Sequence, residues 1–231
     1  RDLVRSRGLG DVYKRQVVKE AASWFLDGVF LNYNSSYLEQ MLEQLLDEDD
    51  SPEVSRFLRA VDVRIDGFRV ERAPEWRGQR VFVRHEVGGK AYELRLSEES
   101  AGTQKLMGLA AYLMTALERG GTVVVDELDA KLHPKLLRYV ILLFKDPEVN
   151  KSGAQLIFSS QDVSTMRNDV FRRDEIWFAA RGEGEASQLW SLADIHEANG
   201  NLVSKNAAFD KQYLSGRYGA DPYLTRIEEW D

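Results

Sequence analysis

Two adjacent carboxylates, Asp126 and Glu127, follow the apolar run Val123–Val125. A short run of β-branched residues is typical of a buried strand. An unpaired ionised carboxylate is costly to remove from water, and the carboxyl ends of parallel strands are where α/β folds bind their ligands. One carboxylate of such a pair can hold Mg²⁺ while its neighbour polarises a water. This is the chemistry that hydrolysis of a nucleoside triphosphate requires.

A second segment carries groups that suit a phosphate. The residues from Ser100 to Gln104 open an apolar stripe that runs to Leu117 and is closed by Gly120 and Gly121. This pattern predicts a helix of about four turns. A serine hydroxyl and free backbone N–H groups at a helix N-terminus can bind a phosphate. The same pattern also fits an ordinary helix cap, and acidic residues at strand ends are common, so each motif alone is weak.

The elements expected around these motifs change in kind near residue 96. From Val61 to Leu96, apolar and polar residues alternate between the turn signals Asp66-Gly67 and Gly88-Gly89, which predicts a small antiparallel sheet. Beyond it, helices and strands alternate, which predicts a mainly parallel sheet. The predicted helices are 35–46, 52–58, 106–117 and 134–144, and the predicted strands are 61–65, 68–70, 81–83, 92–96, 122–125, 155–159, 175–179 and 188–191.

The composition bounds the class of protein. Of 231 residues, 43% are hydrophobic and 30% are charged, and none is cysteine. This fits a globular protein with one sizeable domain or two small ones, and it excludes disulfides and cysteine-based metal sites. No apolar stretch approaches the ~20 residues that span a bilayer, so we expect no membrane partner and a cytoplasmic location. The net charge of −7 does not favour non-specific binding of nucleic acid, which stays open as a partner.

Residues 1–16 look unlike the rest of the chain. They show no helical or strand period and no apolar face, and they hold five basic and two acidic residues. They lack the apolar core of a secretory signal, and their acidic residues do not fit a transit peptide. We interpret the segment as a non-native adapter or cloning scar, with a flexible basic tail as the alternative. Native sequence is then expected upstream of Val17.

Three stretches, taken together and in their order along the chain, resemble a known family. They are Glu98–Leu106, Val125–Pro134 and Leu214–Ala220. They are similar to the C-terminal part of an ABC-type ATPase head of the SMC-like kind. More narrowly, they resemble bacterial AAA-family predicted ATPases of the abortive-phage-infection or overcoming-lysogenisation-like type. The resemblance covers about Val61 to Leu224 and implies an α/β P-loop NTPase fold, with a mainly parallel sheet and a small antiparallel lobe.

The resemblance also implies a domain division. Residues 17–96 would form a helical segment and the antiparallel lobe, and residues 97–231 would hold the signature helix, the Walker B strand and the C-terminal part of the ATPase core. The sequence contains no Gly-x-x-x-x-Gly-Lys-[Ser/Thr], the phosphate-binding loop known as Walker A. We therefore expect a fragment that lacks this part, does not bind ATP tightly by itself and is inactive alone. Exposed sheet edges and apolar faces predict poor solubility.

The resemblance assigns roles to individual residues. Asp126 matches the Walker B aspartate, which supports Mg²⁺, and Glu127 matches the catalytic glutamate, which orients the attacking water. In the family, the signature loop reaches across a dimer to the γ-phosphate of ATP held by the other subunit. The residues that match this loop are Ser100, Ala101, Gly102, Thr103 and Gln104.

Two positions depart from the wider family. Gln161 stands where the family has its switch histidine; an amide can hydrogen-bond a phosphate or water, but it cannot carry a proton as imidazole does. His133 stands where transporter-type heads have the D-loop aspartate, and Leu-His-Pro at this point is usual in the stand-alone branch. We therefore place Gln161 with Glu127 among the catalytic candidates and His133 among the nucleotide-binding ones.

The implied function is ATP binding and Mg²⁺-dependent hydrolysis by a homodimer that sandwiches the nucleotide. The resulting conformational change would drive a partner or effector protein in phage defence. One alternative is an ATP-gated interaction clamp that hydrolyses poorly, because of Gln161. Another is an SMC-type ATPase of DNA repair or chromosome organisation, whose heads are split by heptad coiled coils that this sequence does not show.

Overall fold

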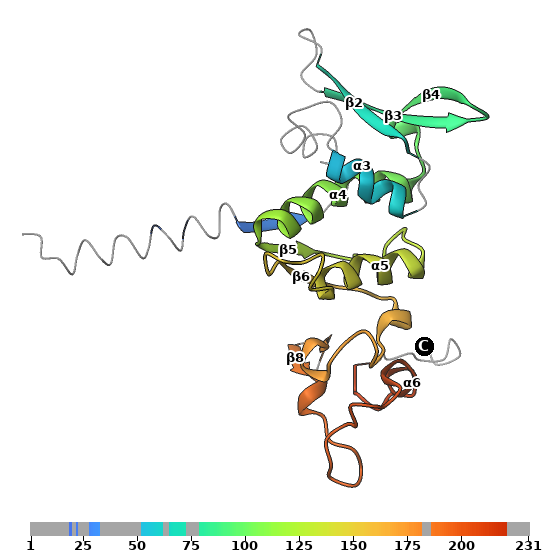
Figure 1. Ribbon diagram of the computed structural model, residues 1–231. Coiled ribbons are helices and arrows are strands. Elements are labelled where there is room, and N and C mark those ends of the chain that lie inside the picture. The colour runs from blue at the N-terminus through green and yellow to red at the C-terminus, as the bar shows by residue number, and fades with distance from the viewer. Residues whose placement is uncertain are drawn as a thin grey trace, which may run out of the picture. The chain divides into compact units, whose positions relative to one another are not determined.

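The chain forms two compact units in a computed structural model (Figure 1). The structure describes residues 19, 22, 28–32, 52–61, 65–72, 79–181 and 186–220. Unit 1 ends at Ser160 and unit 2 begins at Gln161. The interpretation of residues 1–16 and the helix predicted over 35–46 lie outside the described residues.

A parallel sheet lies in unit 1. Its described strands are β1 (Val29–Asn32), β5 (Thr122–Val125) and β6 (Gln155–Phe158), in the order β1-β5-β6. Strand β5 is parallel to both neighbours, and Val123 and Val125 are buried. The predictions of β5 and β6 are confirmed. Strand β1 was not predicted, because its apolar run is too short to distinguish from a loop.

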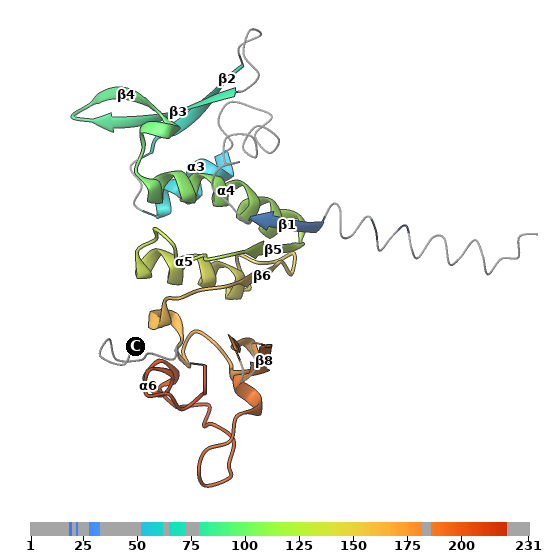
Figure 2. The ribbon, with the colours of Figure 1, turned by 180° about the vertical axis from the view of Figure 1, so that it is seen from behind.

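Among the described residues, three helices of four or more residues lie near this sheet. Helix α4 (Ala101–Arg119) packs beside β5 and against α3 (Pro52–Ala60), and α5 (Pro134–Lys145) packs beside β6 (Figures 1 and 2). Gly120 ends α4 with φ +80°, a conformation that glycine adopts without steric cost, as the sequence predicted. The predicted apolar stripe of α4 is buried, and its residues include Leu106, Leu109, Leu113 and Leu117.

The predicted antiparallel lobe is also present in unit 1. It consists of β2 (Gly67–Arg72), β3 (Gln79–Val87) and β4 (Lys90–Arg95), with neighbouring strands antiparallel. The turn between β3 and β4 is formed by Gly88 and Gly89, both with positive φ, which confirms that turn signal. In both ribbon views this sheet lies on the far side of α3 and α4 from the parallel sheet (Figures 1 and 2).

The strand predicted over 61–65 is wrong at its described ends. Val61 N donates to Phe57 O at 3.1 Å, which continues the last turn of α3, and Ile65 lies outside any strand. Both side chains are buried. Val61 and Ile65 are therefore apolar because they belong to the core, and not because they alternate along a strand. The turn predicted at Asp66-Gly67 is also wrong, because Asp66 N donates to Arg84 O at 2.8 Å and Gly67 begins β2.

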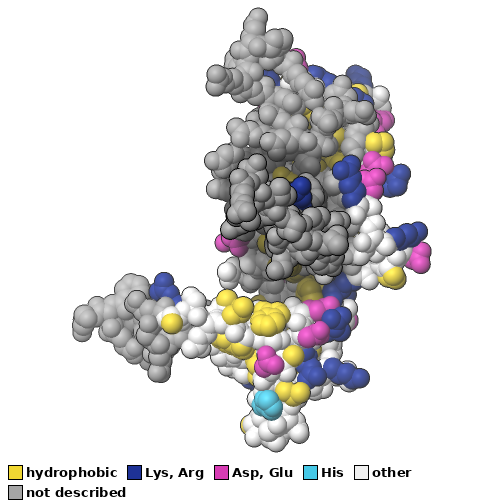
Figure 3. Space-filling model, turned by 90° about the vertical axis from the view of Figure 1, so that its left-hand side faces the viewer, with side chains coloured by type: hydrophobic (Ala, Val, Ile, Leu, Met, Phe, Trp, Pro, Cys, Tyr) yellow, Lys and Arg dark blue, Asp and Glu magenta, His cyan; other side chains and the backbone are white. Residues whose placement is uncertain are grey.

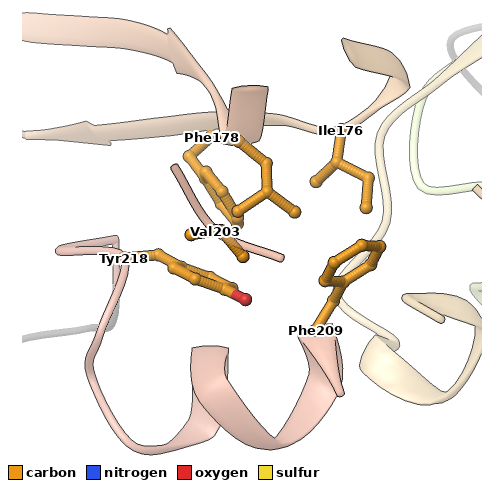
Figure 4. Packing of buried hydrophobic residues seen from close by; sticks show 6 residues of the cluster. Ile176, Phe178, Val203, Phe209 and Tyr218 are labelled. Carbon is orange, nitrogen blue, oxygen red and sulfur yellow. The ribbon is translucent and has the colours of Figure 1, made fainter. Parts of the chain in front are cut away.

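Unit 2 has a small core of its own. Strands β7 (Trp177–Arg181) and β8 (Ser187–Ser191) pair antiparallel in a sheet of two, and α6 (Phe209–Leu214) follows. The two predicted strands are thus present but pair with each other instead of extending the parallel sheet. Figure 4 shows side chains from separate segments of unit 2 packed together. These buried residues are Ile176, Phe178, Leu192, Val203, Phe209 and Tyr218.

The aromatic residues of β7 divide between two environments. Phe178 is buried, whereas Trp177 is 58% exposed. Successive strand residues point to opposite faces, so only one of the two can face the core. The strand patterns predict that Trp177, Phe178 and Trp190 belong to the core, and for Trp177 this prediction is wrong. On the face of unit 2 seen in Figure 3, hydrophobic side chains lie at the surface among charged ones.

Candidate functional site

Asp126 and Glu127 lie in the turn that follows β5, and both are exposed to solvent. Glu127 has φ +49°, in the left-handed region that residues other than glycine rarely adopt. Its carbonyl accepts a hydrogen bond from Ala130 N at 3.0 Å, and Leu128 N donates to Ser159 O at 3.0 Å. The turn is thus closed internally and held against the end of β6.

A serine on the neighbouring strand joins the two carboxylate residues. Ser159 N donates to Val125 O at 3.1 Å, which continues the sheet by one residue. The Ser159 hydroxyl accepts a hydrogen bond from Glu127 N at 2.8 Å and donates one to the Asp126 carboxylate. The orientation of Asp126 therefore depends on β6. Ser159 was not among the predicted site residues, although a polar residue at the carboxyl end of a parallel strand is a signal for such a site.

Lys105, on the first turns of α4, is the second group that the sequence analysis did not identify. Its Nζ donates to Glu127 O at 2.5 Å. Burial lowers the pKa of the Lys105 ammonium, and the carboxylates of Asp129, Glu127 and Asp126 partly oppose this effect. Lys105 immediately follows the Ser100–Gln104 segment in the sequence, but only the structure shows its contact with the turn.

The start of α4 and the loop after β5 touch directly. A Cβ atom on Gly102 would lie 2.9 Å from Lys131 O, closer than real Cβ contacts allow. Lys131 itself has φ +65°. A side chain larger than hydrogen at position 102 would therefore separate α4 from this loop.

The N-terminus of α4 is capped by its own first residues. Ser100 Oγ accepts a hydrogen bond from Thr103 N at 3.1 Å and lies 2.9 Å from Thr103 Oγ1. The Gln104 amide folds back and donates to Glu99 O at 2.8 Å and to Ser97 O at 3.4 Å. Ser100 is exposed, so its hydroxyl lies at the surface while it caps the helix. The Gln104 side chain instead fixes the loop before α4.

A partly buried histidine–glutamate contact holds the same loop from the antiparallel lobe. His85 Nε2, on β3, lies 2.6 Å from Glu99 Oε1, and the Glu99 side chain is 9% exposed. Glu99 precedes the cap residue Ser100 in the sequence. The position of the α4 N-terminus therefore depends on β3 as well as on the loop after β5.

His133 caps α5 at the far end of the loop that begins with Asp126. Its Nδ1 accepts a hydrogen bond from Lys135 N at 3.1 Å. His133 is exposed. Gln161, the first residue of unit 2, is exposed and its catalytic role stays a sequence-based prediction.

Unit 1 therefore brings together most of the predicted site residues. Mg²⁺ is usually held by one or two carboxylates together with phosphates and waters. Asp126 fits such a ligand, because its carboxylate is solvent-exposed and oriented by Ser159. The neighbouring Glu127 carboxylate is equally accessible to a water. None of the described helices is long and apolar enough to cross a membrane.

Residues 7–167 match the protein family described as "AAA domain, putative AbiEii toxin, Type IV TA system". No curated protein matches the chain.

Three solved structures of SMC proteins are similar to parts of the chain. One, described as "Structural biochemistry of ATP-driven dimerization and DNA stimulated activation of SMC ATPases", is 15% identical, with a TM-score of 0.44 over 68% of this chain and 89% of the other. The Smc head of Pyrococcus yayanosii is 16% identical, with a TM-score of 0.44 over 82% of this chain and 31% of the other. The Pyrococcus furiosus head bound to ScpA is 19% identical, with a TM-score of 0.41 over 61% of this chain and 34% of the other. The chain thus spans about a third of the length of the two Pyrococcus proteins.

Proposed function

The chain belongs to the AAA domain family whose model matches residues 7–167. From that premise we propose that it acts as an ATP-dependent switch. In this proposal, the protein binds ATP with Mg²⁺, dimerises around the nucleotide and hydrolyses it, and the change of state drives an effector. One observation carries the proposal. The Asp126–Glu127 turn and the N-terminus of α4 lie against each other in one unit, through the hydrogen bond from Lys105 and the close approach of Gly102 to Lys131.

Each carboxylate has a separate task in this proposal. Asp126 holds Mg²⁺, and its link to Ser159 keeps one carboxylate oxygen directed while the group stays open to solvent. Glu127 orients the attacking water. Phosphoryl transfer depends mainly on positioning and charge stabilisation. A directed Asp126 carboxylate and a Glu127 backbone that is held at its N–H and C=O suit this reaction.

The α4 N-terminus supplies the contact between two copies. The first N–H groups of a helix have no partners within it, and the helix dipole favours an anion there. Ser100 is exposed at this end. We propose that the segment from Ser100 to Gln104 binds the γ-phosphate of ATP held by a second copy, which makes dimerisation depend on nucleotide.

The biological setting is proposed from the family. Its description names a toxin of a type IV toxin–antitoxin system, which supports a role in abortive infection and phage defence. ATP-dependent dimerisation would then switch an effector between two states. An effector controlled in this way could be a separate protein or another part of the same one.

The second candidate is an ATP-gated clamp with little turnover, and Gln161 favours it. By the sequence resemblance, Gln161 stands where the family has a histidine that would exchange a proton. An amide can bind phosphate but does not titrate. Such a protein would dimerise with ATP, and its output would be the interaction itself.

Turnover and mass measurements on the full-length protein test both candidates. We would measure ATP hydrolysis, and molar mass by light scattering with and without Mg²⁺-ATP, for the wild type, Glu127→Gln and Glu148→Gln. Glu148 is an exposed glutamate in the loop after α5 and serves as the matched control. We expect the wild type and Glu148→Gln to hydrolyse ATP, and Glu127→Gln to lose about 100-fold or more of that activity while accumulating as an ATP-bound dimer.

The remaining outcomes separate the alternatives. A wild-type protein that dimerises with ATP but shows no turnover would favour the clamp. A wild-type protein that neither hydrolyses ATP nor changes its mass with ATP would contradict the proposed function.

A further inference from the structure

We propose that Lys105 is a positioning residue that couples α4 to the Glu127 backbone of the same subunit, so that movement of the α4 N-terminus changes the placement of the Glu127 carboxylate. The kinetic part of this proposal rests on the proposed function. The contact itself does not. Lys105 Nζ donates to Glu127 O at 2.5 Å, and the two residues are 22 positions apart in the sequence.

The backbone of Glu127 needs external support. A residue other than glycine in the left-handed region carries about 1–3 kcal/mol of strain, and Glu127 has φ +49°. Side chains from two different elements hold it. Ser159, at the end of β6, binds the N–H of Glu127 at 2.8 Å, and Lys105, on α4, binds the C=O. Hydrogen bonds from a charged donor are stronger than neutral ones, so Lys105 is the stronger of these two supports.

The environment of Lys105 fits a fixed role. The side chain is half-buried, and burial lowers the pKa of its ammonium. Asp129, Glu127 and Asp126 lie close enough to oppose that effect. A lysine that serves only solubility would remain fully hydrated. Lys105 loses hydration, and the nearby carboxylates of the turn offset part of that cost.

The coupling follows from the rigidity of α4. Lys105 lies one turn along the helix from Ala101, the first helical residue, and a helix moves as one body over that length. A Cβ atom on Gly102 would lie only 2.9 Å from Lys131 O, so α4 packs closely against the loop that contains Lys131. A shift of the α4 N-terminus on binding a second copy would therefore move Lys105 Nζ, and the Glu127 carbonyl with it.

The test compares Lys105→Met, Lys105→Arg and Lys151→Met in the full-length protein. Lys151 is an exposed loop lysine and is the control. The measurements are kcat and KM for ATP, the free energy of unfolding in urea, and hydrogen exchange of residues 126–132. We expect Lys105→Met to lower kcat about 10-fold or more, since small misplacements of catalytic groups are costly, while KM changes less than about 2-fold.

Lys105→Arg and the amide hydrogen exchange supply two further expectations. Lys105→Arg should restore most of the lost kcat, because it keeps a charged donor. Amides of residues 126–132 should exchange faster in Lys105→Met than in Lys105→Arg or Lys151→Met.

Three outcomes would overturn the proposal. A raised KM with unchanged kcat would show that Lys105 contacts the nucleotide. Equal losses of unfolding free energy in Lys105→Met and Lys105→Arg, with kcat unchanged, would show a purely structural role. Unchanged exchange in Lys105→Met would show that Lys105 does not hold the turn. The exchange measurement needs no turnover, so it decides the proposal even if the wild type fails to hydrolyse ATP and the proposed function falls.

Discussion

Ser159 donates a hydrogen bond from its hydroxyl to the Asp126 carboxylate, and the same oxygen accepts one from Glu127 N at 2.8 Å. One side chain directly after β6 therefore contacts both residues of the acidic pair that follows β5. Both carboxylates are exposed. The Ser159 hydroxyl directs the Asp126 carboxylate, while Ser159 and Lys105 hold the N–H and the C=O of the Glu127 backbone.

Replacing Ser159 tests this arrangement. Ser159→Ala should lower the free energy of unfolding by about 1 kcal/mol, the net value of a typical hydrogen bond. It should also raise the Mg²⁺ concentration needed for half-maximal ATP turnover, because the Asp126 carboxylate is no longer directed. Urea denaturation and a Mg²⁺ titration of activity measure the two effects. Ser159→Thr keeps the hydroxyl and should behave as the wild type; equal Mg²⁺ dependence in Ser159→Ala and Ser159→Thr would refute this role.

Two substitutions at Ser100 separate helix capping from phosphate binding. Ser100→Ala removes the acceptor for Thr103 N and should cost about 1 kcal/mol of unfolding free energy. Ser100→Asp keeps an acceptor, and its charge suits the helix dipole, so its stability should match that of the wild type. The added carboxylate should nevertheless repel a phosphate and abolish ATP-dependent dimerisation. Light scattering with Mg²⁺-ATP decides the point: a Ser100→Asp protein that still dimerises excludes a phosphate contact at this residue.

Because α4 lies so close to Lys131 at Gly102, replacing this glycine with alanine should destabilise the protein, although Gly→Ala usually stabilises a helix. In an open helical position, Gly→Ala stabilises by about 0.5–1 kcal/mol. Here the new methyl would lie 2.9 Å from Lys131 O, a backbone atom. Forced overpacking costs about 1–3 kcal/mol, so Gly102→Ala should lower the free energy of unfolding. Urea denaturation beside Ala101→Ser, a change at the exposed neighbouring position, measures the difference. A stabilised Gly102→Ala protein would show that the loop yields without cost.

The sequence predicted correctly those elements that are encoded by a few neighbouring residues and that suit their surroundings in the fold. The cap at Ser100, the helix end at Gly120 and the turn at Gly88-Gly89 are each encoded within a few residues, and each is present. The pair Asp126 and Glu127 was found for the same reason, because an acidic pair after an apolar run is a local signal.

The errors arose where a local pattern has two structural explanations. Alternation in a strand divides residues between two faces but does not say which face is buried, so Trp177 could not be distinguished from Phe178. Val61 and Ile65 are buried without belonging to a strand. Lys105 and Ser159 act through contacts 22 and 33 residues away. Such contacts depend on how α4, β5 and β6 meet, which no short stretch encodes.

Tyr218 provides a pH-dependent test of unit 2. Its ring lies 5.3 Å from that of Phe178, and its hydroxyl donates to Gln212 Oε1 at 2.7 Å. Burial raises the pKa of the Tyr218 phenol to about 12, above the value of about 10 for an unfolded chain. Between these values the folded state binds more protons than the unfolded state, so stability falls as pH rises. The contribution of Tyr218 is complete below about pH 10 and is lost as pH rises through about 12.

Tyr218→Phe isolates this contribution, because it keeps the ring and removes the ionisable hydroxyl. Tyrosinate absorbance, titrated in both proteins, should differ by one group that ionises at about pH 12 in the native state and near pH 10 in concentrated urea. Across the interval between those values, the free energy of unfolding should fall further in the wild type than in Tyr218→Phe. If the differing group ionises near pH 10 in the native protein as well, the Tyr218 hydroxyl is hydrated and the core of unit 2 is open to water at that residue.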